Sequence, residues 1–214
     1  MSEPTGERPP TRRDEYAEVT RLAVVDAARE LFGANGYVKT KVDEIARRAR
    51  VSPATVYAQC GGKQGLLETL MDMWTSGTRV QQIIDDCRDA GTAREKLSVL
   101  AVGYVLIYAE SGDIIRIVTE AAASIPAAAE FLHVANLRHQ EALAEIVAGI
   151  RATGEIVDDL SDEDVVRTIF YHFRYEQFTL ASEEFGWGVA RARDTIREWL
   201  AQAILKSQPV ESGV

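Results

Sequence analysis

Apolar residues recur along most of this chain at the three- and four-residue spacing of amphipathic α-helices. This spacing predicts helices at 15–34, 63–87, 93–111, 113–124, 126–152, 162–184 and 187–206. Glycine or proline marks their ends, as at Gly36, Gly112, Pro126 and Gly186. No segment shows the period-two alternation that predicts a β-strand. The sequence therefore predicts an all-α fold.

Two shorter helices are predicted in the segment that runs from Thr40 to Gly61. Thr40 is the predicted N-cap of the first helix, and Ser52-Pro53 opens the second. The apolar face of the first helix comprises Val42, Ile45, Ala46 and Ala49. Two short helices that share a small core across a tight turn are typical of a helix-turn-helix reader of the DNA major groove.

The net charge of the chain is -9, which by itself argues against a nucleic-acid partner. The charge is unevenly placed, however. Residues 1–65 hold 11 basic and 9 acidic residues, whereas residues 66–214 hold 13 basic and 24 acidic residues. Because salt screens charges beyond about 8–10 Å, the local excess of positive charge decides phosphate binding. The asymmetry supports two functional regions.

The composition predicts a protein of the cytoplasm. Its 214 residues, 46% of them hydrophobic, suffice for a sizeable core. The two cysteines, Cys60 and Cys87, provide no disulfide framework. Residues 1–18 lack the apolar centre of a signal peptide, and the apolar run at 97–108 is shorter than the roughly 20 residues of a membrane span. We expect no membrane partner.

Enzymatic chemistry finds no support in the sequence. No H-E-x-x-H motif, phosphate-binding glycine loop or nucleophile elbow occurs. The three histidines, His133, His139 and His172, lack carboxylate partners at the spacing of metal ligands. We therefore expect no catalytic residue, no metal and no cofactor. Cys60 lies near basic residues, which leaves a redox-sensing thiol open beside the simpler reading of a small apolar filler.

The segment from Arg21 to Leu70 resembles the TetR family of bacterial transcriptional regulators. The matching residues are Ala27, Ala28, Leu31, Phe32, Gly36, Tyr37, Thr40, Val42, Ile45, Ala46, Ala49, Val51, Ser52, Thr55, Tyr57, Lys63 and Leu67. The resemblance implies a homodimer that binds a palindromic double-stranded DNA operator and usually represses transcription. It also implies that a small molecule bound in the second domain releases the DNA.

Composition, periodicity and this resemblance together set the predicted domain limits. Residues 1–14 form a disordered N-terminal arm and residues 15–62 the helix-turn-helix DNA-binding domain. Residues 63–206 form the helical ligand-binding and dimerisation domain, and residues 207–214 a flexible tail. On the arm, Arg12 and Arg13 are equally compatible with a minor-groove contact and with a solubilising tail.

Two departures from the family pattern bear on DNA reading. Arg50 stands where the family commonly has glycine, so a positive φ there would cost about 1 kcal/mol. Ala58, Gln59 and Cys60 replace the bulky residues that usually follow Tyr57. These replacements keep an alternative open, in which the chain is a ligand-binding or protein-interaction helical module with degenerate DNA reading.

The predicted DNA contacts lie on the helix-turn-helix and its borders. They are Lys39, Thr40, Lys41, Arg47, Arg50, Ser52, Pro53, Ala54, Thr55, Tyr57, Gln59 and Lys63. Tyr57 is expected to reach a phosphate or a base edge, and Thr40 to approach a phosphate at a helix N-terminus. Gln59 suits adenine, and the short side chains before it allow a close approach to the groove.

The second domain supplies candidates for an effector pocket and for a dimer face. Helical domains bind small molecules in mainly apolar cavities with a few polar groups, so the effector is expected to be largely apolar. The pocket candidates are Trp74, Tyr104, Tyr108, Ile117, Phe131, Asn136 and Phe173. The last two helices are expected to pair with their symmetry mates. The dimer candidates are Phe170, Phe178, Trp187, Ile196, Trp199, Leu200 and Ala203.

Overall fold

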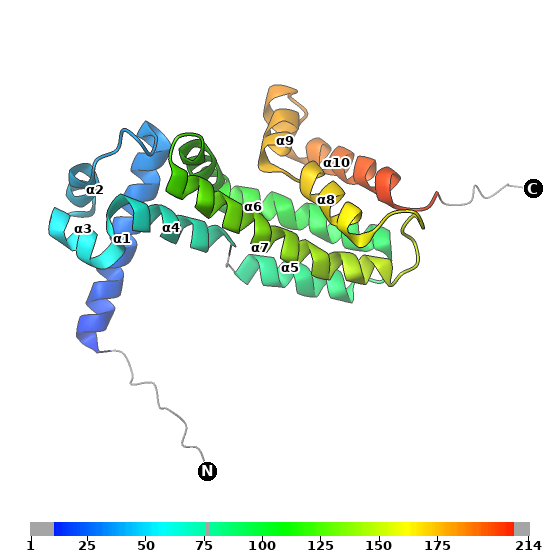
Figure 1. Ribbon diagram of the computed structural model, residues 1–214, viewed down its shortest axis with the longest axis horizontal. Coiled ribbons are helices and arrows are strands. Elements are labelled where there is room, and N and C mark those ends of the chain that lie inside the picture. Colours follow the sequence, from blue (N-terminus) through cyan, green and yellow to red (C-terminus); the bar gives the residue numbers. More distant parts are fainter. Residues whose placement is uncertain (1–10, 76–77, 208–214) are drawn as a thin grey trace, which may run out of the picture. The chain divides into compact units, whose positions relative to one another are not determined.

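A computed structural model describes residues 11–75 and 78–207 of the chain. It is all-α as predicted (Figure 1). The helices are α1 (Arg12–Asn35), α2 (Val42–Ala49), α3 (Pro53–Cys60), α4 (Gly62–Thr75), α5 (Thr78–Asp89), α6 (Ala93–Ala122), α7 (Pro126–Arg151), α8 (Asp162–His172), α9 (Tyr175–Thr179) and α10 (Gly188–Ile204). A π-helical turn, Leu180–Glu184, continues α9. The described residues contain no strand, only one isolated bridge between Ile156 and Leu205.

The chain divides into two compact units. The N-terminal unit holds the residues up to Leu70 together with Arg116–Ala129, and the C-terminal unit holds Met71–Ile115 and the residues from Glu130 onward. This division differs from the predicted domain border after residue 62, because the first part of α4 packs with α1 to α3. The functional limits of the domains stay predictions.

The N-terminal unit is built on α1, which begins earlier than predicted. The Thr11 hydroxyl accepts a hydrogen bond from the backbone N–H of Asp14, and the Asp14 carboxylate accepts one from the backbone N–H of Thr11. This capping box starts the helix at Arg12, so Arg12 and Arg13 are helical rather than part of a disordered arm. The rest of that predicted arm, residues 1–10, lies outside the described residues.

The core of the N-terminal unit joins four helices. Phe32 of α1, Ile45 of α2, Val56 of α3 and Leu66 of α4 are all completely buried. At ~25 cal/mol per Å² of apolar surface, burying one such side chain contributes about 1.5–3 kcal/mol. Neither α2 nor α3 is long enough to be stable alone, so this shared core holds the helix-turn-helix in shape.

In the C-terminal unit, α6 is one continuous helix where two were predicted. The expected break at Gly112 does not occur, because the ring of Tyr175 packs directly against it. A Cβ at residue 112 would lie 2.9 Å from Cε2 of Tyr175, so glycine here permits a close contact rather than a helix end. Among the described residues, α6 alone has the length and composition of a membrane span, with a mean hydropathy of 1.4 over 18 residues. Core helices pass the same test.

Two other predicted helices are divided. The segment predicted at 63–87 forms α4 and α5, with residues 76–77 outside the description. The segment predicted at 162–184 ends as α8 at His172 and restarts at Tyr175. The predicted flexible tail lies outside the described residues from 208 onward. Before it, Leu205 is buried and Lys206 donates its backbone N–H to the Glu155 carbonyl at 2.8 Å.

Candidate nucleic-acid interface

The turn between α2 and α3 depends on a residue with left-handed backbone geometry. Arg50 has φ 60° and ψ 40°, and it is the one non-glycine residue with positive φ in the described part of the chain. The backbone N–H of Val51 then donates to the Ala46 carbonyl at 2.9 Å. Arg50 thus adopts the left-handed geometry for which the family commonly has glycine at this position. For an L-residue this conformation costs ~1–2 kcal/mol. The Arg50 side chain in turn places a cation at the turn between α2 and α3.

Ser52 and Pro53 start α3 as the sequence predicted. The Ser52 hydroxyl accepts a hydrogen bond from the backbone N–H of Thr55 at 3.1 Å, and Pro53 occupies the first helical position. The two hydroxyls of Ser52 and Thr55 also lie 2.8 Å apart. Ser52, Pro53, Ala54 and Gln59 are exposed, whereas Thr55 is half-buried. Most of the outer face of α3 is therefore available to a partner.

Tyr57 points away from the core, with 60% of its surface exposed. Two glycines directly after α3 leave room for its ring. Gly61 ends α3 with φ 67°, and Gly62 follows with φ 73°. A Cβ at residue 62 would lie 2.7 Å from Cε1 of the Tyr57 ring, so this ring rests on the bare glycine backbone. The sequence analysis missed this role of Gly62; its Gly-Gly pattern indicated only a helix end.

The ammonium group of Lys63 contacts other residues of the same unit. Its ammonium group donates to the Val38 carbonyl at 3.3 Å and lies 4.5 Å from the centre of the Tyr37 ring. Burial lowers the pKa of this lysine. Tyr37 in turn packs on Phe32 of the core, with ring centres 5.0 Å apart. Lys63 thus holds the loop before α2 in place, a role that its position at the start of a helix did not indicate.

Thr40 does not have the predicted position. It is 1% exposed, and its hydroxyl donates to the carbonyls of Gly36 (2.9 Å) and Leu31 (3.2 Å). The N-cap of α2 is Lys41, whose backbone N–H donates to the Glu44 carboxylate at 2.8 Å. The predicted N-cap role of Thr40 is therefore wrong, because its hydroxyl binds carbonyls at the end of α1 instead. The phosphate contact at this helix N-terminus stays a prediction.

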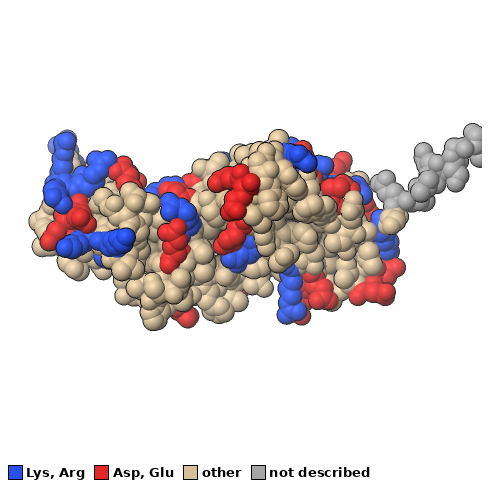
Figure 2. Space-filling model, turned by 90° about the horizontal axis from the view of Figure 1, so that it is seen from above, with Lys and Arg blue, Asp and Glu red and all other residues tan. Residues whose placement is uncertain are grey.

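Exposed cations surround α2 and α3. Lys39, Lys41, Arg47 and Arg50 are all exposed. The neighbouring Arg48 pairs with Glu30 of α1 at 2.5 Å. In Figure 2, lysine and arginine side chains gather at the end of the view that carries these helices. Together with Tyr57 and the outer face of α3, they form a continuous set of donors suited to phosphates and base edges.

Behind α3, Cys60 is buried against α1. Burial raises the pKa of its thiol, and the nearby Arg21 lowers it by a smaller amount. A protonated, buried thiol fills space as a small apolar group would.

The family model described as "Bacterial regulatory proteins, tetR family" matches residues 24–70, which hold the core of α1, the whole helix-turn-helix and the start of α4. Residues 24–70 thus form a TetR-family DNA-binding domain. Within that family, the conformation of Arg50 and the residues that follow Tyr57 are the departures of this member.

Curated relatives match over the same region. The fatty acid metabolism regulator protein of Bacillus subtilis is 30% identical over 79 residues, which are 37% of this chain and 40% of that protein. The HTH-type transcriptional regulator BetI of Rhizobium meliloti is 36% identical over 86 residues, 38% of this chain and 40% of that protein. The chain therefore matches less than half the length of these relatives.

Solved structures match over nearly the whole chain. SmeT of Stenotrophomonas maltophilia in complex with triclosan has a TM-score of 0.73 at 15% identity, covering 92% of this chain and 98% of that one. FadR of Bacillus subtilis in complex with stearoyl-CoA has a TM-score of 0.71 at 21% identity, covering 84% and 96%. At such identities, the likeness shows the fold alone. It extends the TetR-family architecture into the C-terminal unit.

The predicted pocket residues do not form one group. Tyr104, Tyr108 and Phe173 come together in the C-terminal unit, where the Tyr104 and Phe173 rings stack at 4.4 Å. Ile117 is buried in the N-terminal unit. The other three, Trp74, Phe131 and Asn136, are half-buried on α4 and α7. The sequence analysis missed His139, which hydrogen-bonds to Tyr104.

The predicted dimer residues separate into two groups. Phe178, Ile196 and Leu200 are buried inside their own C-terminal unit, so they cannot form the interface that was predicted for them. Trp199 and Ala203 are exposed on α10, while Phe170 and Trp187 are half-buried. The Trp187 and Trp199 rings meet edge to face at 5.9 Å. Helices that are apolar on more than one face do not reveal from sequence which face meets a partner.

Proposed function

We propose that this TetR-family chain is a cytoplasmic transcriptional repressor that binds a palindromic operator as a homodimer. The observation that carries the proposal is the exposed Tyr57, whose ring packs on Gly62, among exposed cations of α2 and α3. Its ring is held on Gly62 before any partner binds, so little ordering entropy opposes the contact. A largely apolar small molecule bound in the C-terminal unit would release the DNA.

Selection from random duplex DNA tests this function. The full-length protein is expected to enrich a palindrome whose half-sites lie about one DNA turn apart, ~34–36 Å. Affinity for the selected duplex should fall steeply with salt, because phosphate contacts release counterions. A folded dimer that enriches no sequence, before and after refolding to remove bound molecules, would contradict the proposal. It would favour the module with degenerate DNA reading.

Tyr57 provides a sharper test at a single residue. Tyr57→Ala should weaken operator binding about 10- to 100-fold, since it removes a pre-ordered contact worth ~1–3 kcal/mol. Tyr57→Phe keeps the ring on Gly62 but lacks the hydroxyl. Comparison with Tyr57→Ala therefore distinguishes the contribution of the hydroxyl to operator affinity from that of the ring. Both variants should unfold near the wild-type denaturant midpoint, because the side chain is mostly exposed. Unchanged affinity in a titration of Tyr57→Ala would remove this residue from the interface.

The homodimer is proposed on the exposed aromatic surface around α10. Phe185, 57% exposed, and Trp199, 50% exposed, both contact Trp187. Such aromatic surface is typical of interface centres. Trp199→Glu should give a monomer in analytical ultracentrifugation, whereas Leu106→Glu, at an exposed position of α6, should leave the dimer intact. A dimer of unchanged stability in Trp199→Glu would place the interface elsewhere.

A further inference from the structure

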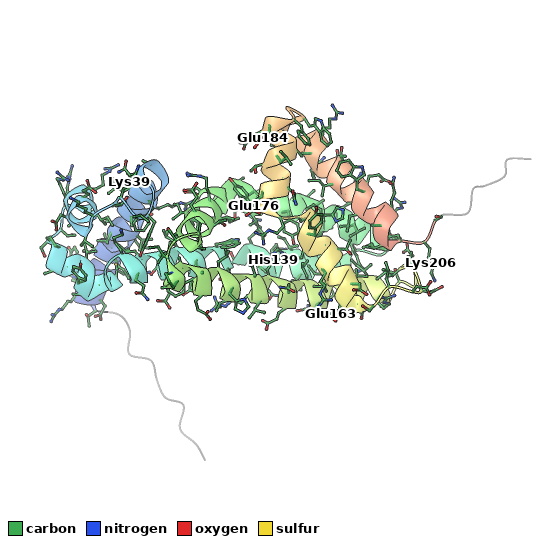
Figure 3. The ribbon with its side chains drawn as sticks, turned by 45° about the horizontal axis from the view of Figure 1, so that its top comes forward. Lys39, His139, Glu163, Glu176, Glu184 and Lys206 are labelled. Carbon is green, nitrogen blue, oxygen red and sulfur yellow. The ribbon has the colours of Figure 1, made fainter. Side chains whose placement is uncertain are left out.

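An aromatic cluster lies in the C-terminal unit where α6, α7 and α8 meet. It comprises Tyr104, Tyr108, His139, Phe170 and Phe173. The Tyr104 ring lies nearly parallel to that of Phe173, at 10° between planes. The Tyr108 hydroxyl donates to the Phe173 carbonyl, a group that the end of α8 leaves free. In Figure 3, His139 lies among the helices of the C-terminal unit.

His139 retains unused hydrogen-bonding capacity inside this cluster. Its Nε2 is bonded to the Tyr104 hydroxyl. Because Tyr104 is buried, its hydroxyl proton needs an acceptor, and Nε2 is the atom that provides one. Burial lowers the pKa of His139 to about 4, so at neutral pH the ring carries one proton, on Nδ1. No described residue accepts a hydrogen bond from Nδ1. Thr119 Oγ1 is the one buried side-chain polar atom of the described residues that lacks a partner, so Nδ1 is open to solvent rather than sealed in the core.

Arg174 places a cation near the same part of the cluster. The guanidinium of Arg174 is 5.4 Å from the centre of the Phe170 ring, and the His139 ring is 5.0 Å from the same centre. Phe170 and His139 are both half-buried, so this part of the cluster reaches the surface. Arg174 is also close enough to His139 to disfavour protonation of the imidazole. The His139 ring and the Arg174 guanidinium thus both lie next to the Phe170 ring.

Arg174 already holds a carboxylate in this structure. Glu176, two residues later, accepts hydrogen bonds from Nε at 3.0 Å and from Nη2 at 3.1 Å. Both side chains of this ion pair are partly exposed. Such pairs contribute little to stability, so an incoming carboxylate can replace Glu176 without a large cost. The bidentate geometry shows which functional group this guanidinium accommodates.

We propose that Arg174 and His139 bind the carboxylate of an organic acid whose aromatic or aliphatic body packs against Phe170. In the absence of that acid, the Glu176 carboxylate pairs with the Arg174 guanidinium. One guanidinium, one neutral N–H and aromatic walls suit a singly charged carboxylate better than a phosphate dianion, which would require further cations. The proposal rests on the proposed function, because it assigns a chemical class to the effector of the C-terminal unit.

Calorimetric titration of the full-length protein with benzoate, 2-naphthoate and octanoate tests the site, with 2-naphthamide as the uncharged control. At least one carboxylate should bind, and the amide should bind at least tenfold more weakly. Arg174→Gln should weaken carboxylate binding at least tenfold. Glu176→Gln should strengthen it about two- to fivefold, because the internal competitor is gone. Arg88→Gln, which removes an arginine paired with Glu145 on another face of the unit, should change nothing.

A second measurement observes His139 directly. The chain has three histidines, so nitrogen-detected NMR resolves the Nδ1–H of His139 with a His139→Gln variant for assignment. Carboxylate addition should shift that resonance and slow its exchange with water. A purely structural role of Arg174 would leave it unmoved. Circular dichroism of Arg174→Gln and Glu176→Gln confirms that both variants are folded.

Three results would overturn the proposal: no carboxylate binds, the amide binds equally well, or Glu176→Gln weakens binding. Operator affinity is measured separately in each case. Carboxylate binding that leaves operator affinity unchanged supports the site while removing effector release from the proposed function. Carboxylate binding by a protein that recognises no operator likewise supports the site and contradicts the repressor.

Discussion

Replacement of Arg50 by glycine should stabilise the protein and weaken its DNA binding at the same time. With φ 60° and ψ 40°, an L-residue at this position costs ~1–2 kcal/mol relative to a right-handed conformation. Glycine avoids that cost but loses ~0.5–1 kcal/mol more backbone entropy on folding than alanine does. The difference predicts that Arg50→Gly exceeds Arg50→Ala in unfolding free energy by about 0.5–1 kcal/mol.

DNA binding should change in the opposite direction. Arg50 is an exposed cation between α2 and α3, and in the proposed dimer on its operator the loss of this cation would remove one phosphate contact from each protomer. Each contact contributes about 0.9 to the slope of log affinity against log salt, so the slope of a dimer should fall by ~1.8. Arg50→Ala and Arg50→Gly should lose this slope equally, because both lack the charge.

Urea denaturation and salt-dependent operator titration of the two variants provide the assays. Arg50→Lys, which retains a charge and a Cβ, is the matched control for both measurements. Equal or lower stability of Arg50→Gly relative to Arg50→Ala would refute the reasoning about backbone strain. An unchanged salt slope in both variants would show that this cation does not face a phosphate.

Two further predictions concern the C-terminal unit. Lys96→Met should lower the unfolding free energy by about 2–3 kcal/mol in urea denaturation, because the buried ammonium donates to the carbonyls of Cys87 and Ala90, each at 2.6 Å. Lys206→Met, at an exposed ion pair, should change stability by less than ~1 kcal/mol, and an equal loss in both variants would contradict the assignment. His139 has a folded pKa of about 4, below its usual 6.5, so the unfolded chain takes up its proton first as the pH falls. Stability should therefore be complete above pH 6.5 and decline toward pH 4, by about 2 kcal/mol at pH 5, and His139→Gln should flatten this decline. If the stability of His139→Gln has the same pH dependence as that of the wild type, other titratable groups cause the decline.

The sequence predicted best where local chemistry decides the structure. Ser52 and Pro53 start α3 because the cap and the first helical position depend on neighbouring backbone atoms alone. The positive φ of Arg50 follows from the end of α2, and the exposure of Tyr57 follows from the apolar side already supplied by Val56. These features need no knowledge of distant residues.

Prediction failed where a distant residue decides. Gly112 normally favours a helix end, but the Tyr175 ring lies against it and α6 continues. Thr40 is a good N-cap by type, yet the carbonyls of α1 bind its hydroxyl first. The contact between His139 and Tyr104 joins residues 35 apart on two helices, and no spacing rule in the sequence indicates it.

The π-helical turn at Leu180–Glu184 has a consequence for how the chain can vary in length. A π-turn accommodates one residue more than an α-helical turn, so it behaves as a tolerated single-residue insertion. Removal of that residue would restore α-helical winding and rotate everything after it by about 100° around the helix axis. Trp187 and Trp199 both follow the turn, so the aromatic pair that they form would be rotated as a whole relative to α9. The aromatic surface of α10 is thus specified by residue count as much as by residue type.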